Sequence, residues 1–263
     1  MRTPADALLA QIPFFVRTQM EWRRLIRVMD RPTDLSRCQW TQLAAFALDF
    51  RPDTIIELGR GYGNSTAMFL EVCAQTGGRL ISMCRSDAFE RERLGKPESW
   101  FSLADIRVCE ITEQMVEVGE RVFVFWDAHG FEVAEWVLAY LMPLIANKPH
   151  LVVMHDVSDV RYNGARREYR GPIWKGEIGE REFQLGNLFS KVPQAISALE
   201  FTTRNHVQFH AAESSLVAMT PAQLAECRRL GDLFELTADW HWFSLNERPG
   251  PYTFPHRAVA KAA

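Results

Sequence analysis

Two short polar segments each place an aspartate and a histidine directly after an apolar run. Asp127 and His129 follow one such run, and His155 and Asp156 follow another. A carboxylate can bind a hard cation or orient a reacting group. Histidine titrates at about pH 6.5, so it can accept a proton from a hydroxyl near neutral pH. These residue types predict a catalytic pair, with His129 as the base and Asp127 beside it.

The two aspartates are expected to meet, because the carboxyl ends of parallel strands lie at one edge of a sheet. Facing carboxylates repel each other unless a proton or a cation separates them. Mg²⁺ binds through one or two carboxylates together with water, so Asp127, Asp156 and His155 are candidate metal ligands. The alternatives are structural. Asp127 would cap the next helix with His129 simply exposed, and His155 and Asp156 would bond to loop backbone.

A third polar segment combines an acidic residue with three glycines at alternate positions. Glycine lets the chain bend sharply and lets a ligand lie against bare backbone. Dinucleotide-binding turns have the spacing G-x-G-x-x-G, whereas here the third glycine comes one residue earlier. This spacing suits a ligand whose amino-acid and ribose groups contact the turn. The candidate cofactor-binding residues of this segment are Glu57, Gly59, Gly61, Gly63, Asn64 and Ser65.

Two further acidic residues follow the next two predicted strands. An acid after the second strand could bind the hydroxyls of such a ligand. Here Cys84 ends that strand, and the nearest acid is Asp87, which could equally cap the following helix. Glu110 follows the third strand, where an adenine edge would be read, although an N-cap role for Thr112 is an alternative.

Alternation of strand and helix patterns predicts an α/β fold. The sheet is expected to be Rossmann-like and mostly parallel, with helices on both faces and an antiparallel C-terminal strand pair. The predicted strands are 54–58, 79–84, 106–109, 121–126 and 150–154, followed by the late pair 199–209 and 214–219. The predicted helices are 36–49, 64–76, 88–95, 112–117 and 131–146, after an amphipathic helical start.

Composition excludes several classes of protein. The chain has 263 residues, 47% of them hydrophobic and 24% charged, as in ordinary globular proteins. A net charge of −3 argues against general nucleic-acid binding. Five scattered cysteines without a C-x-x-C pair argue against a disulfide framework or a structural zinc site. No signal peptide or membrane span is expected, so we expect a cytoplasmic protein that binds neither nucleic acid nor membrane.

The chain resembles the class I S-adenosylmethionine-dependent methyltransferases, in the small-molecule O-methyltransferase branch that includes cephalosporin-hydroxylase-like proteins. The resemblance covers roughly residues 36–160 and rests on ELGRGYGNST at 57–66, WDAH at 126–129 and VVMHDV at 152–157. It implies S-adenosylmethionine as cofactor, Mg²⁺ on Asp127 and Asp156, and His129 as base. Two positions depart from the family pattern, namely Cys84 in place of a ribose acid and His155 in place of an acid.

The resemblance also implies a division of the chain. Residues 1–50 would form an N-terminal helical segment, 51–220 the methyltransferase domain, and 221–263 a C-terminal extension packed on that domain. The segment 157–181 is long, aperiodic and rich in arginine, tyrosine and glycine, which predicts a substrate lid or a plain solvated loop.

The predicted function is therefore methyl transfer from S-adenosylmethionine to a hydroxyl of a small metabolite, such as a sugar or a natural product. A homo-oligomer is compatible with this function. Two other functions are weighed against it. One is a catalytically degenerate methyltransferase fold that serves as a binding or regulatory partner, which Cys84 would favour. The other is a nucleotide- or NAD-binding Rossmann enzyme, against which the early third glycine argues.

Overall fold

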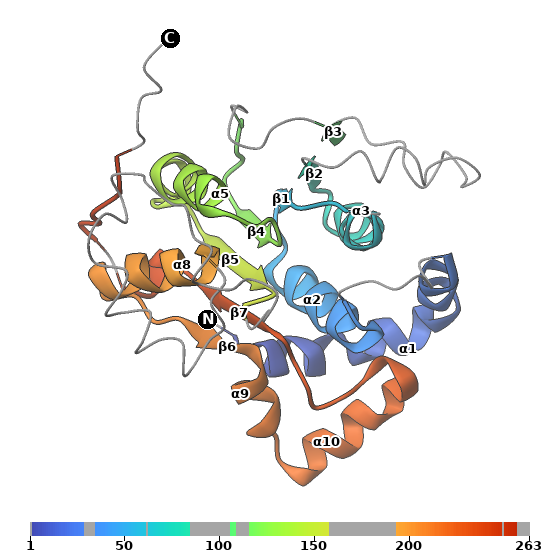
Figure 1. Cartoon of the computed structure of the whole chain (residues 1–263). Helices are drawn as coiled ribbons and strands as arrows, with labels where there is room; N and C mark the ends of the chain where they lie inside the picture. Colours follow the sequence, from blue (N-terminus) through green and yellow to red (C-terminus); the bar gives the residue numbers. More distant parts are fainter. Residues whose placement is uncertain are drawn as a thin grey trace.

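A seven-stranded mixed sheet forms the centre of the described part of the chain (Figure 1). The computed structural model describes residues 2–28, 35–61, 63–84, 106–108, 116–157, 193–248 and 250–256. Across the sheet the strands are β3 (Ile106–Val108), β2 (Arg79–Cys84), β1 (Thr54–Leu58), β4 (Val122–Trp126), β5 (His150–His155), β7 (Trp240–Phe243) and β6 (His210–Ala211). The first five are parallel, and β7 runs antiparallel to β5 and β6. The predicted fold class is confirmed.

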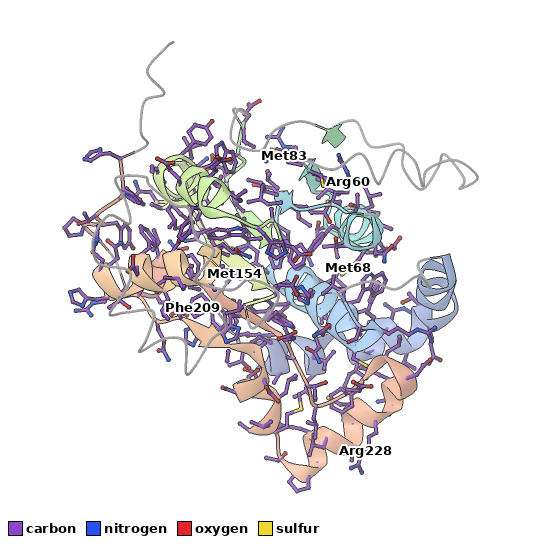
Figure 2. All side chains as sticks on the ribbon, in the orientation of Figure 1. Arg60, Met68, Met83, Met154, Phe209 and Arg228 are labelled. Carbon is purple, nitrogen blue, oxygen red and sulfur yellow. The ribbon has the colours of Figure 1, made fainter. Side chains whose placement is uncertain are left out.

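The central strands are apolar throughout because helices cover both faces of the sheet. Every residue of β1, β4 and β5 is buried. Successive residues alternate between two cores: Ile55 and Phe123 pack on one face, and Ile56 and Val124 on the other. Figure 2 shows side chains filling the space on each side of the ribbon.

One face carries mainly the helices from the two ends of the chain. These are α1 (Pro4–Val28), α2 (Arg37–Phe50), α3 (Asn64–Thr76), α9 (Ala212–Val217), α10 (Pro221–Cys227) and the 3-10 segment η5 (Arg228–Leu233). The opposite face carries α5 (Phe131–Trp136), the π-helical η3 (Val137–Leu141), α6 (Met142–Ile145) and α8 (Pro193–Arg204). The sheet therefore lies between two helical layers, and its carboxyl edge is left to the loops after β1, β4 and β5.

The prediction of strands in two late segments is wrong. Residues 199–209 lie largely in α8, and 214–219 lie largely in α9. Strand-forming types such as Phe201, Thr202 and Thr203 favour extended chain by their local preference. The buried positions Ala195, Ala198 and Phe201 instead recur at helical spacing and pack against the sheet. The antiparallel pair is instead formed by the short β6 and by β7, and only β7 lies in the C-terminal tail.

Several expectations fall outside the described residues. They include the helices at 88–95 and most of 112–117, and the proposed lid apart from Val157. The division at residue 220 stays a prediction, although β7 shows that the sheet takes a strand from beyond it. Among the residues that the structure describes, no helix is both long and apolar enough to cross a membrane.

His241, in β7, should make the free energy of unfolding depend on pH. Its ring stacks on Phe209 with centroids 5.3 Å apart, and burial lowers its pKa to about 4, against the opposing effect of Asp239. Between pH 6.5 and about 4, the unfolded chain binds a proton at this histidine that the folded protein does not. The free energy of unfolding should therefore fall as the pH drops through this range.

His241→Gln should remove about 2–3 kcal/mol of that decline. Urea unfolding of both proteins near neutral pH and at about pH 4.5 measures the difference, with the neutral-pH pair as the internal control. An equal decline in both proteins would contradict the role of His241.

Candidate active site

The glycine turn after β1 packs directly against the loop after β4. Gly59 has φ +99, and a side chain there would place its Cβ 2.5 Å from the backbone oxygen of Asp127. The backbone nitrogen of Asp127 donates to the oxygen of Leu58 at 2.8 Å. Only glycine allows this approach, so the two loops share a backbone contact at the carboxyl edge of the sheet.

Gly59→Ala should therefore destabilise the protein far more than Gly61→Ala. At Gly59 the added methyl group meets backbone and the φ value is strained, which together cost roughly 2–5 kcal/mol. Gly61 also has positive φ, but no atom of the described residues lies within 4 Å of the position that an added methyl group would take, so only about 1 kcal/mol is expected there. Chemical denaturation of the two variants tests this, and equal losses would contradict the close packing at Gly59.

Glu57 is fully buried beneath the turn. Its carboxylate accepts hydrogen bonds from the hydroxyls of Ser65, Thr66 and Ser82, the Thr66 bond being 2.7 Å long. Arg60 is buried beside it and donates to the backbone oxygen of Ser82 at 3.0 Å. Burial raises the pKa of Glu57, and the three hydroxyls and Arg60 oppose that rise. The carboxylate thus ties α3 and β2 to β1.

This geometry bears on two predicted cofactor-binding residues, Glu57 and Ser65, whose roles stay predictions. Glu57 has no exposed surface with which to touch a ligand, and it contacts side-chain hydroxyls in place of the amides of the turn. Ser65 directs its hydroxyl at Glu57, so that hydroxyl is already engaged. In the described structure both residues hold the turn in shape.

Asn64 is the residue of the turn best placed to meet a ligand. It begins α3 and is 8% exposed, and its backbone oxygen accepts a bond of 3.2 Å from the Trp40 indole. Its side-chain Oδ1 is buried and has no hydrogen-bond partner among the described residues. Since an unsatisfied buried acceptor is costly, Asn64 stays a predicted cofactor-binding residue. The other candidates Asp87 and Glu110 lie outside the described residues.

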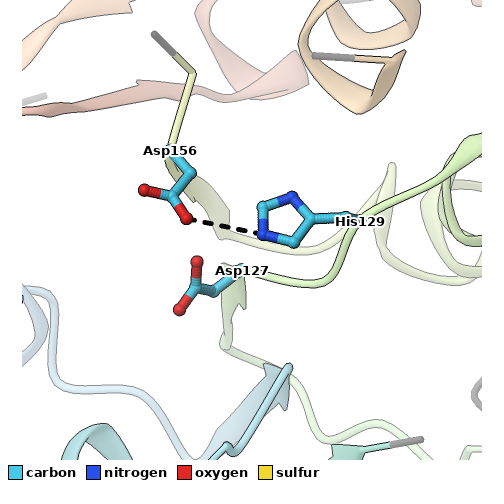
Figure 3. Close-up of side chains that lie close together, drawn as sticks. All are labelled: Asp127, His129 and Asp156. Carbon is cyan, nitrogen blue, oxygen red and sulfur yellow. Dashed lines mark ion pairs between the residues drawn. The ribbon is translucent and has the colours of Figure 1, made fainter. Parts of the chain in front are cut away.

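Asp127, His129 and Asp156 converge at the ends of β4 and β5, as predicted (Figure 3). One donor atom from each lies within 4.8 Å of the others. His129 Nε2 lies 3.4 Å from Asp156 Oδ2. Asp156 has φ +55, a left-handed conformation that aspartate tolerates better than most residues. Burial raises the pKa of Asp127, and the neighbouring imidazoles oppose that rise.

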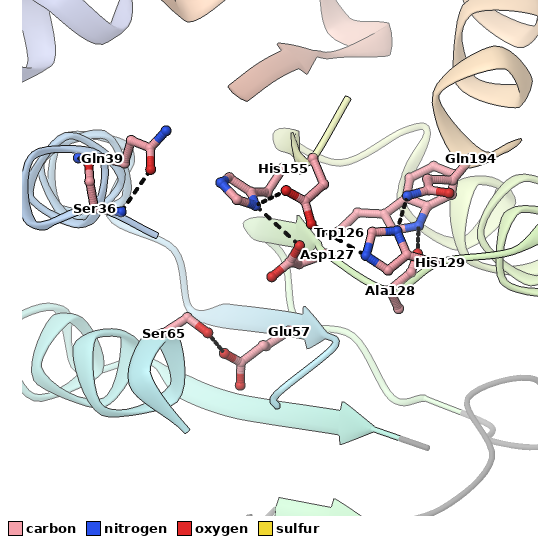
Figure 4. Close-up of polar contacts among 11 residues, drawn as sticks. Ser36, Gln39, Glu57, Ser65, Trp126, Asp127, Ala128, His129, His155 and Gln194 are labelled. Atoms are coloured by element: carbon pink, nitrogen blue, oxygen red, sulfur yellow. Dashed lines mark hydrogen bonds and ion pairs between the residues drawn. The ribbon is translucent and has the colours of Figure 1, made fainter. Parts of the chain in front are cut away.

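His155 joins the two carboxylates from within the core. It is fully buried, and its Nδ1 lies 3.3 Å from one oxygen of Asp127 and 3.3 Å from one of Asp156 (Figure 4). Burial lowers the pKa of His155, but the carboxylates of Asp127, Asp156 and Asp239 raise it by more, and the net shift is upward. The predicted ligand role of His155 at a shared metal stays a prediction, since its contacts are those of a hydrogen-bond donor to both acids.

Gln194 is a site residue that no feature of the sequence predicts. It lies in the first turn of α8 and is fully buried, with its Nε2 2.6 Å from His129 Nδ1 (Figure 4). Its Oε1 lies 3.5 Å from the backbone nitrogen of Gly130. No local motif marks Gln194, and it is 65 residues from His129. Only the packing of α8 against α5 brings the pair together.

A cavity of about 590 Å³ lies at the opposite edge of the sheet, near the start of β5. Its charged lining residues are already paired: Arg2 bonds Asp49 at 2.7 Å, and Arg121 contacts the ring and backbone oxygen of Phe50. Its His150 uses both ring nitrogens in contacts with backbone groups. The acid–base cluster of Asp127, His129 and Asp156 lies at the carboxyl edge, where open α/β sheets bind ligands, so the candidate site is there.

No protein-family model matches the chain, and no curated protein matches it in sequence. Solved structures resemble its fold. The SAH-bound structure cmcI-N160 is 21% identical over 44% of this chain, with a TM-score of 0.35, and the match spans 58% of that chain's length. A proposed caffeoyl-CoA O-methyltransferase from Staphylococcus aureus is 14% identical, with 89% of this chain and 98% of the other covered and a TM-score of 0.48.

The SAH-bound Podospora anserina methyltransferase PaMTH1 is 15% identical, with 91% of this chain and 87% of the other covered and a TM-score of 0.43. These likenesses concern the fold alone, and they do not assign an activity to this chain.

Proposed function

We propose that this protein transfers a methyl group from S-adenosylmethionine to a hydroxyl of a small metabolite. One observation carries the proposal. The glycine turn after β1 is in backbone contact with the loop that bears Asp127, and the His129–Asp156 pair lies beside it. A turn suited to a nucleoside and an acid–base cluster therefore adjoin at the edge where open α/β sheets bind ligands.

The residues of the turn fit a ligand with amino-acid and ribose groups. Asn64 offers a buried acceptor without a partner in the described chain, and Gly61 leaves its side of the turn open. Bound S-adenosylmethionine supplies a methyl group on a positively charged sulfur. Asn64 and the backbone of the turn would hold its amino-acid and ribose groups, with Asp87 and Glu110 as further candidates beyond the described residues.

The cluster would supply acid–base chemistry and orientation. His129 Nε2 faces Asp156 and would accept the proton of the substrate hydroxyl in the tautomer that carries its hydrogen on Nδ1. Asp127 and Asp156 would orient the hydroxyl oxygen from the neighbouring strand end. Holding the two reacting groups in line can supply on the order of 7–11 kcal/mol of the barrier reduction, so positioning is the main contribution.

A divalent cation fits the same cluster, and we propose Mg²⁺. Asp127 and Asp156 lie in one cluster of possible metal ligands, and carboxylates are the ligands that Mg²⁺ prefers, so His129 would be left to act as the base. The cation would orient substrate oxygens. Calorimetric titration with Mg²⁺, and with Mn²⁺ because an imidazole is present, should show binding that Asp156→Asn weakens. Absence of binding by both cations would remove the metal from the proposal.

Calorimetry with S-adenosylmethionine and S-adenosylhomocysteine tests the central claim. We expect both to bind, and Asn64→Ala to weaken both, whereas Gln75→Ala on the exposed side of the same helix should not. If neither compound binds at about millimolar concentration, the binding free energy is weaker than roughly −4 kcal/mol and the proposal fails.

A second candidate is a degenerate methyltransferase fold that acts as a binding or regulatory partner. Cys84, buried at the end of β2 where a ribose-binding acid is expected, favours it. This protein would retain the fold and lack cofactor binding in the same titration. An NAD-binding Rossmann enzyme is the weaker alternative, and titration with NAD would reveal it.

A further inference from the structure

The contact between Gln194 and His129 fixes where the imidazole carries its hydrogen. An amide nitrogen can only donate a hydrogen bond. Gln194 Nε2 lies 2.6 Å from His129 Nδ1, and in this orientation of the amide Nδ1 accepts. Neutral His129 then carries its hydrogen on Nε2, which faces Asp156 Oδ2 at 3.4 Å. In this form His129 is a donor to Asp156 and has no lone pair directed into the cluster.

The other end of the same amide is weakly held. Its oxygen lies 3.5 Å from the backbone nitrogen of Gly130, at the long limit of a hydrogen bond. The whole side chain is buried, so water does not compete for either end. A half-turn of the amide would replace a strong donor at Nδ1 by an acceptor. It would also replace the weak contact to Gly130 by one between two donors.

We infer that Gln194 is a positioning residue that sets the tautomer of His129. With the nitrogen of the amide toward the ring, His129 donates from Nε2 to Asp156. With the oxygen toward the ring, Nδ1 carries the hydrogen and the Nε2 lone pair is directed at Asp156 and Asp127. The second form is the one able to accept a proton or bind a cation, and its catalytic meaning rests on the function proposed above.

Nitrogen NMR of the imidazole rings tests this inference without any ligand or substrate. Comparison with His129→Gln identifies the His129 signals, and spectra are recorded at a pH where the ring is neutral. In the unmodified protein, Nδ1 should resonate as an unprotonated nitrogen and Nε2 as a protonated one. Gln194→Glu, when its carboxylate is ionised, can only accept at this position, so it should then move the hydrogen to Nδ1 and exchange the two signals.

Two further variants separate this role from a general disturbance of α8. Gln194→Leu removes donor and acceptor together and should give a mixture of both tautomers. Ser197→Ala, a change at another buried polar position of the same helix, should leave the His129 signals as they are. If Gln194→Glu does not fold, the unmodified protein and Gln194→Leu still decide the question.

The inference is overturned if the unmodified protein carries its hydrogen on Nδ1. It is equally overturned if the Gln194 variants keep the tautomer of the unmodified protein, or if Ser197→Ala shifts the ring as much as Gln194→Glu. Failure of the proposed function is seen separately, as the absence of S-adenosylmethionine binding. The two results are therefore independent.

Discussion

Glu57→Ala should lower the free energy of unfolding by about 3–5 kcal/mol, because it removes the acceptor of a fully buried network. The hydroxyls of Ser65, Thr66 and Ser82 would each lose their bond to the carboxylate, and the buried Arg60 would lose its nearby negative charge. The turn after β1 and the start of α3 should loosen first. Urea unfolding measures the loss, and amide hydrogen exchange at residues 59–66 locates it.

Two controls sharpen this result. Glu120→Ala removes a carboxylate whose side chain is 88% exposed, and it should change stability by no more than about 0.5 kcal/mol. Glu57→Gln keeps the shape of the side chain. Because burial raises the pKa of Glu57 above its ordinary 4.5, the stability of the unmodified protein should fall as pH rises from that value. Glu57→Gln lacks this fall. A small effect of Glu57→Ala would show that the network is not structural.

His129→Ala should lower the rate of methyl transfer by about 10²- to 10⁴-fold while leaving the affinity for S-adenosylmethionine nearly unchanged. The contacts described for His129 are with Asp156 and Gln194, and none is with the glycine turn. A base that acts on the acceptor should therefore affect kcat and spare cofactor binding. The rate is measured with labelled S-adenosylmethionine on whichever hydroxyl compound the unmodified protein methylates, and the affinity is measured by calorimetry.

The matched control is His256→Ala, because His256 is exposed and distant in sequence from the cluster. It should leave both rate and affinity as they are. A fall in rate and affinity together for His129→Ala would assign that residue a structural role. An unchanged rate would transfer the role of base to another group of the cluster, such as Asp127 or Asp156.

The central sheet could be predicted closely because its signals are local. β1 and β2 have the predicted bounds, and β4 and β5 differ from prediction by one residue at one end. Continuous apolar runs bounded by turns are typical of buried parallel strands. The edge formed by β6 and β7 could not be placed in this way. β6 has two residues, and Trp240–Phe243 lies in a tail whose prolines favour irregular structure.

In the candidate site, too, features with a local sequence pattern could be predicted and features that depend on packing between elements could not. The convergence of Asp127, His129 and Asp156 follows from the rule that parallel strands end at one edge, which needs no side-chain detail. The role of Glu57 depends on which way its side chain turns, and three hydroxyls from two other elements decide that. Gln194 reaches the site only through the packing of α8, a helix whose sequence in part favours a strand. Contacts made across layers leave no local pattern.

The backbone contact between Gly59 and Asp127 has a mechanical consequence. The turn expected to bind a nucleoside contacts the loop that carries Asp127 directly through the main chain. No side chain lies between the two backbones at this contact. We expect a displacement of the glycine turn to move the loop after β4 with it. A ligand that binds to the turn would therefore shift the position of Asp127. Binding at the turn and alignment of the acid would be coupled.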